Sequence, residues 1–147
     1  MTGAAERPPL PGSWPRQPDG FTCGPSVVVV AQDLAGGPVT GWPGFTARVH
    51  VTNRRLHRWW PRLLGTTPWA VARALGGRVR PFRHDAVRAA LPHPVPVFVG
   101  SRLLPRHVVL VLAATPQDLL AYDPARGDLV PLSTLRWPVR WCAVLPP

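Results

Sequence analysis

The sequence predicts an α+β domain in which N-terminal helices pack on a C-terminal antiparallel sheet. Helix signals occupy the chain before Pro92, whereas short apolar runs separated by turn residues occupy it from Val95 onward. The length of 147 residues suits one domain. We assign residues 16–147 to that domain and the proline-rich residues 1–15 to a flexible arm.

The first helix is predicted over residues 25–34. Pro25 would lie in its first turn and Gly36 just past its end, which is typical of helix boundaries. Four consecutive valines oppose the assignment, because β-branched residues prefer strands. If the helix forms, it places Cys23 at its start.

The other elements follow in helix-then-strand order. Further helices are predicted at 69–75, behind a Thr-Thr-Pro cap, and at 83–91, before Pro92. We expect the stretch 38–65 to be irregular. Pro96 indicates that its strand is an edge strand or has just started there. The predicted strands are 95–100, 107–113, 119–123, 128–132 and 137–145.

Cys23 is the first candidate for chemistry. Unpaired N–H groups and the positive end of the dipole at a helix start stabilise a thiolate, which is a nucleophile that needs a base. The other cysteine, Cys142, lies in an apolar run and is expected to be an inert core residue. We expect both thiols to be free rather than joined in a disulfide, because a cytoplasmic setting is expected.

His107 and Asp123 belong to two apolar runs joined by a turn at 115–118, so they should lie on one antiparallel hairpin. If paired residue numbers sum to 230, the two side chains face each other. A sum of 232 leaves them diagonal on the same face, and a sum of 231 puts them on opposite faces. In either even register the hairpin can hold an imidazole and the carboxylate that orients it.

The ordered set is more specific than any member. Gln17 stands six residues before Cys23-Gly24-Pro25, His107 leads an apolar strand, and Asp123-Pro124 follows sixteen residues later. This set resembles the papain-like bacteriocin-processing peptidases, the double-glycine leader peptidases, and their stand-alone relatives. The resemblance implies a papain-like fold and a cysteine peptidase with Cys23 as nucleophile, His107 as base, Asp123 as orienter and Gln17 as oxyanion donor. It also implies a peptide or protein substrate and no cofactor.

Composition limits the partners. All 17 basic residues are arginine, against 7 acidic ones, and the net charge of +10 predicts attraction to acidic partners or polyanions. Residues 1–16 contain no apolar core of a signal peptide, and no apolar run is long enough for a membrane span, so a cytoplasmic protein without a membrane partner is expected. The histidines and cysteines show no zinc-site spacing, so no metal is expected.

The segment 48–62 combines arginines with Trp59 and Trp60 and has three interpretations. It could bind single-stranded nucleic acid through stacking and charge, form the wall of a substrate cleft, or be a solvated helix face with one aromatic edge packed inward. We favour the solvated face, and nucleic acid is not the expected partner. Two alternatives to a peptidase stay open: an acyltransferase that uses the same acyl-enzyme, and a non-enzymatic basic module that binds nucleic acid or an acidic protein. The sequence specifies neither the substrate nor the oligomeric state.

Overall fold

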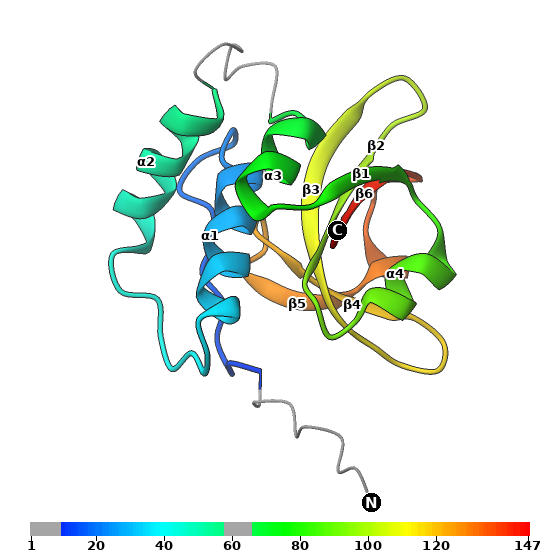
Figure 1. Cartoon of the computed structure of the whole chain (residues 1–147), viewed down its shortest axis with the longest axis horizontal. Coiled ribbons are helices and arrows are strands. Elements are labelled where there is room, and N and C mark those ends of the chain that lie inside the picture. Colours follow the sequence, from blue (N-terminus) through cyan, green and yellow to red (C-terminus); the bar gives the residue numbers. More distant parts are fainter. Residues whose placement is uncertain (1–9, 58–65) are drawn as a thin grey trace, which may run out of the picture.

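A computed structural model describes residues 10–57 and 66–147. Three helices, α1, α2 and α3, precede a six-stranded sheet, and Figure 1 shows α1 lying between α2 and the sheet. All the strand pairs are antiparallel, in the order β1-β6-β2-β3-β4-β5, which confirms the predicted α+β class. The elements are α1 Cys23–Ala35, α2 Phe45–Leu56, α3 Pro68–Leu75, β1 Arg78–Pro81, α4 His84–Ala90, β2 Val95–Gly100, β3 Pro105–Ala114, β4 Leu119–Asp123, β5 Asp128–Pro131, the short 3-10 helix η2 Leu132–Thr134 and β6 Val139–Leu145.

The sheet has an apolar cluster on each face. Along β3, Val108 and Leu110 belong to the cluster with α1, α2 and α3, whereas Val109 and Val111 belong to the cluster that contains Val87 of α4. This alternation is the side-chain period of a strand. Because both faces are covered, β3 is apolar on consecutive residues, and its register is fixed by packing on two sides.

The valines of α1 are helical because they are buried. The residues Val27, Val28, Val29 and Val30 expose 0%, 1%, 2% and 0% of their surface. Full burial of a valine side chain contributes about 1.5–3 kcal/mol, which exceeds the few tenths that its low helix propensity costs. Tertiary packing therefore overrides the local preference for a strand.

The expectation of an irregular stretch at 38–65 is wrong for α2. This helix begins after Gly44, whose φ of 65° lies in the left-handed region. Phe45, Val49 and Asn53 are buried at positions spaced four apart, so one narrow face packs against α1 while the rest is polar. The sequence gives little sign of this helix. A Trp-Pro-Gly turn precedes it, and it contains valine and threonine, which have low helix propensity. Residues 58–65 lie outside the described part of the chain.

Two details of the sheet differ from expectation. β1 was not predicted, because its exposed side chains give no apolar alternation and it exists through pairing with β6. Pro96 does not mark an edge, since β2 lies between β6 and β3. The alternative of a strand start is right: Pro96 is the second residue of β2, and β6 pairs with β2 only from Val97 onward.

Gly100 is required by the tight connection between β2 and β3. A Cβ atom there would collide with the carbonyl oxygen of Leu104 and lie 2.7 Å from the Arg106 nitrogen and 2.8 Å from the Pro105 Cα, all of them backbone atoms that cannot rotate away. We expect Gly100→Ala to lower the free energy of unfolding by about 1–3 kcal/mol. Gly41→Ala is the matched control, because a Cβ atom added at Gly41 would meet no other atom within 4 Å. Urea denaturation of both variants checks the difference, and equal midpoints would contradict it.

Candidate active site

His107 and Asp123 are brought together by an irregularity in the β3–β4 hairpin. Next to the turn, Ala114 pairs with Leu119, so paired residue numbers sum to 233. A register shift at Leu112 changes the sum, and beyond it Leu110 pairs with Tyr122, a sum of 232. The odd register would have put His107 and Asp123 on opposite faces. The shift places them diagonally on the same face, which is one of the two productive registers predicted.

The imidazole of His107 is hydrogen-bonded to the carboxylate of Asp123. Nε2 lies 2.7 Å from Oδ1, and both side chains are buried. The same carboxylate oxygen accepts a hydrogen bond of 3.0 Å from the Ala125 N–H, in the turn that follows β4. Burial opposes ionisation of Asp123, but the bond from His107 and the charge beside it hold its pKa below the ordinary value. A carboxylate so placed fixes the ring orientation and leaves Nδ1 for another partner.

We expect that partner to be Cys23. Burial alone would lower the pKa of His107, but hydrogen bonds to Asp123 and to the Cys23 thiol, with the attraction of both charges, raise it to about 9. Cys23 is the first residue of α1 and His107 the third of β3, so the two meet at the ends of their elements. With Cys23 as its second partner, the imidazole would join a thiol to a carboxylate.

The start of α1 is held by close packing. Gly24, directly after Cys23, has no room for a side chain, because a Cβ would lie 2.5 Å from the Cβ of Thr66. Before the helix, the Phe21 N–H donates to Asp19 Oδ1 at 2.9 Å, and the Ser26 N–H donates to the Thr22 carbonyl at 3.0 Å. These contacts fix the direction in which Cys23 leaves the turn.

Gln17 is anchored to the turn that carries Asp123. Its backbone N–H donates to the Pro124 carbonyl at 2.8 Å, and the neighbouring Arg16 Nε donates to the Ala125 carbonyl at 3.0 Å. The Gln17 Nε2 donates one hydrogen bond to the Asp19 carbonyl at 2.5 Å, and since an amide nitrogen carries two N–H groups, one further donor remains. The buried Oε1 has no hydrogen-bond partner among the described residues.

Residues 13–15, which the sequence assigns to the arm, contact the domain through aromatic rings. Trp14 stacks on Tyr122 with ring centroids 5.5 Å apart and lies 5.8 Å from the ring of Trp42. The Tyr122 hydroxyl donates to the Pro15 carbonyl at 2.5 Å, and burial raises the pKa of Tyr122 well above its usual range, so this donor keeps its proton. The indole N–H of Trp42 donates to the Ser13 carbonyl at 3.0 Å. The chain just before Gln17 is therefore held at both Tyr122 and Trp42.

Sequence reasoning missed the role of Tyr122, Trp14 and Trp42 in positioning Gln17. A tyrosine directly before Asp123-Pro124 is a weak signal, since its partner is a backbone carbonyl 107 residues away. It also missed Trp137, whose ring centroid lies 6.4 Å from that of His107 and whose ring carries the Arg136 guanidinium at 4.6 Å. Trp137 packs against the cluster that contains Val109 and Val111, and His107 lies on the same face of β3 as these two valines.

The coupled charges predict a pH dependence. The pKa of His107 is raised to about 9 from an ordinary 6.5, so its share of the folding free energy is complete below pH 6.5 and is lost as pH rises through about 9. The pKa of Asp123 is lowered from an ordinary 3.8, so its share is present above that value and is lost as pH falls below it. We expect the melting temperature to fall between pH 7 and pH 10, and His107→Gln to flatten that fall. Calorimetry across this range checks it, and an unchanged slope in the variant would contradict it.

The two thiols and the arginine-rich segment also have defined places in the fold. Cys23 and Cys142 are both free thiols, and burial raises the pKa of Cys142 to about 11. In segment 48–62, Arg54 and Arg55 lie on the exposed face of α2, which agrees with the solvated helix face, whereas Trp59 and Trp60 lie outside the described residues. In the described chain no helix is long and apolar enough to cross a membrane.

Comparison with solved structures identifies the fold. The peptidase domain of Streptococcus ComA, a bifunctional ABC transporter involved in a quorum-sensing pathway, superposes with a TM-score of 0.61 at 20% identity, over 92% of this chain and 98% of that one. A double-glycine motif protease from an AMS/PCAT transporter, solved with a leader peptide, gives 0.59 at 16% identity, over 90% and 89%. No protein-family model and no curated protein matches the sequence. The predicted papain-like fold of bacteriocin-processing peptidase domains is confirmed.

Proposed function

We propose that this chain is a cysteine peptidase that cleaves a leader or another small peptide, with Cys23, His107, Asp123 and Gln17 as its active-site residues. One observation carries the proposal: the buried imidazole of His107 is bonded to the Asp123 carboxylate at 2.7 Å. The raised pKa of His107, to which Cys23 contributes, supports the place of the thiol beside it. The structural likeness to domains described as peptidases adds support at the level of the fold. The alternative of a non-enzymatic basic binding module gives no reason for these contacts.

The reaction assigns one task to each side chain. Proton transfer from Cys23 to His107 gives a thiolate and an imidazolium, and the thiolate attacks the peptide carbonyl. The imidazolium then protonates the leaving amine, and the freed imidazole activates the water that hydrolyses the thioester. Asp123 orients the ring and stabilises its charge throughout. The Cys23 N–H and the second Nε2–H of Gln17 stabilise the oxyanion.

The substrate is tested with paired peptides. A peptide with two glycines before the scissile bond is compared with one in which both glycines are replaced by leucine, and products are identified by mass spectrometry. The proposal expects cleavage after the glycines and a trapped thioester on Cys23 when the reaction is quenched in acid. Addition of an amine acceptor separates hydrolysis from acyl transfer, because only transfer gives an adduct. A thioester absent with every peptide and probe would sink the proposal.

Gln17→Ala should reduce kcat by about 10²–10³-fold with a small change in KM, because an oxyanion donor acts on the transition state. Arg16→Ala is the matched control: it loses the bond to the Ala125 carbonyl on the same segment but no proposed oxyanion donor. Steady-state kinetics on one peptide check both variants. If the two variants lose activity equally, the effect belongs to the segment and not to the carboxamide.

A further inference from the structure

A pocket of about 310 Å³ opens between α1, α2 and α3, away from the chain of contacts at Cys23. Each helix contributes one face to it, because the lining residues are spaced three or four apart. They are Val28 and Gln32 of α1, Thr52, Arg55 and Leu56 of α2, and Ala70, Arg73 and Ala74 of α3. Gln32 lies nine residues after Cys23, which is about 14 Å along the helix axis.

The lining combines an apolar floor with a cationic rim. Val28 is almost fully buried, and the alanines on either side of Arg73 leave the space that larger side chains would fill. Arg55 and Arg73 come from different helices, and both residues are exposed. Gln32 and Thr52 add an amide and a hydroxyl. Among the described residues, no acidic side chain lines this pocket.

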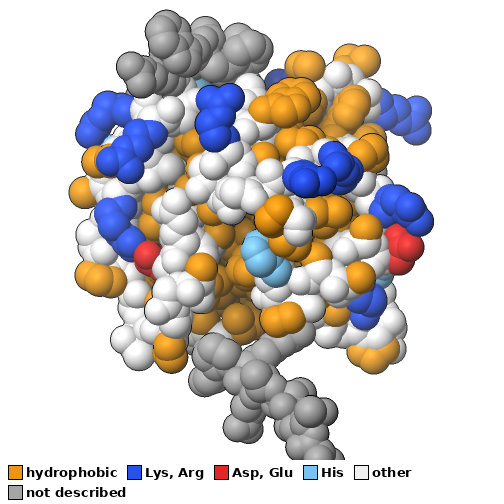
Figure 2. Space-filling view, viewed as in Figure 1, with side chains coloured by type: hydrophobic (Ala, Val, Ile, Leu, Met, Phe, Trp, Pro, Cys, Tyr) orange, Lys and Arg blue, Asp and Glu red, His pale blue; other side chains and the backbone are white. Residues whose placement is uncertain are grey.

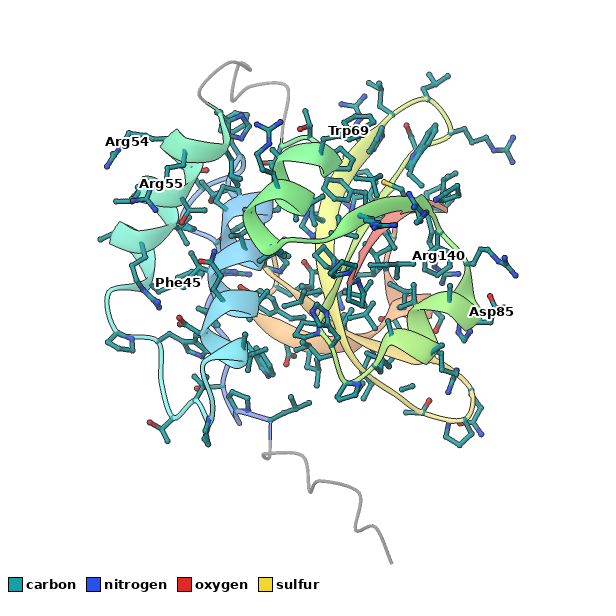
Figure 3. All side chains as sticks on the ribbon, in the orientation of Figure 1. Phe45, Arg54, Arg55, Trp69, Asp85 and Arg140 are labelled. Atoms are coloured by element: carbon teal, nitrogen blue, oxygen red, sulfur yellow. The ribbon has the colours of Figure 1, made fainter. Side chains whose placement is uncertain are left out.

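The two arginines are not neutralised by the chain in its described part. The carboxylate nearest to the pocket in sequence, Asp33, is already held by Arg48 through two hydrogen bonds of 2.7 Å. Arg55 and Arg73 form no ion pair with a described residue. Figure 2 shows basic side chains over this part of the surface with little acidic surface near them, and Figure 3 labels Arg54 and Arg55 on α2.

We propose that this pocket binds a small organic anion, a carboxylate or phosphate group carried on a short apolar stem. Guanidinium groups offer paired N–H donors that match both oxyanions, the amide and hydroxyl can complete the coordination, and the floor takes the stem. A volume near 300 Å³ suits a ligand of that size. Because both guanidinium groups reach solvent, affinity is about millimolar and falls with salt.

The test uses two probes, inorganic phosphate and glutarate, titrated into isotope-labelled protein at constant ionic strength with amide shifts followed by NMR. We expect saturable shifts confined to α1, α2 and α3. The double variant Arg55→Gln/Arg73→Gln should weaken binding at least tenfold, while Arg54→Gln, on the same helix but outside the lining, should leave it unchanged. Cys23→Ala should still bind, which separates this site from catalysis.

The two probes distinguish a phosphorylated ligand from a carboxylate ligand. Tighter binding of phosphate assigns a phosphorylated ligand, and tighter binding of glutarate assigns a carboxylate. Shifts that do not saturate, or that are equally sensitive to Arg54→Gln, would overturn the proposal, since they report charge on the surface at large. Oligonucleotide binding that outcompetes both probes and requires Arg54 would overturn it in favour of an extended nucleic-acid surface.

Discussion

Cys23→Ala is expected to lower kcat by about 10⁶-fold, the loss that follows removal of the nucleophile from a catalytic triad. No other proposed active-site side chain carries a thiol, so the remaining rate would come only from binding and from oxyanion donors. Cys23 is only half-buried, and the fold should persist. Peptide kinetics measure the first effect, and circular dichroism with thermal melting measures the second.

Cys142 supplies the control for Cys23. It is the other cysteine of the chain, it lies in β6, and burial raises its pKa to about 11. Cys142→Ala should therefore keep its activity, and iodoacetamide at pH 7 should label Cys23 well before Cys142. Equal labelling of the two thiols, or full activity in Cys23→Ala, would rule out a nucleophile at residue 23.

Asp123→Ala should lower kcat by about 10⁴-fold, since the imidazole loses the acceptor that fixes its orientation. Asp123→Asn separates orientation from charge. The asparagine side chain keeps the geometry but neither the charge nor the correct imidazole tautomer, so we expect a similar loss of about 10⁴-fold.

The pH profile then reports the charge. In the parent protein, kcat/KM should fall as pH rises through about 9, where His107 loses its proton. Without the negative charge of Asp123 that alkaline limb should move to lower pH in both variants. An unmoved limb would show that the carboxylate does not act through His107. Melting temperatures of both variants control for the bond from the Ala125 N–H, which also depends on residue 123.

The sequence predicts those parts of the site that depend on neighbouring residues, namely helix boundaries and the hairpin. Pro25 and the glycines bound α1, and Thr67 caps α3 by accepting a hydrogen bond from the Ala70 N–H at 3.1 Å. The hairpin was predictable because apolar runs flank a turn. Its register was left open between an opposite and a diagonal pairing, because turn chemistry does not reveal whether a strand contains an extra residue.

The parts that were not predictable depend on contacts between distant segments. α2 is stabilised by a stripe of only three buried residues, which falls below what a periodicity search detects. The position of Gln17 depends on the Pro124 carbonyl and on Tyr122, more than 100 residues later. The sequence shows that Gln17 stands six residues before Cys23, but it does not show the contacts that hold Gln17 in place.

The register shift at Leu112 means that β3 contains one residue more than a regular pairing with β4 would need. Loss of a single residue between His107 and Ala113 would straighten β3 and keep the imidazole diagonal to the carboxylate. Gain of a single residue would turn the imidazole to the other side, unless a second irregularity formed. Length changes in this strand are therefore asymmetric: relatives that keep the His–Asp pair can be shorter here by one residue, whereas every added residue requires a further irregularity.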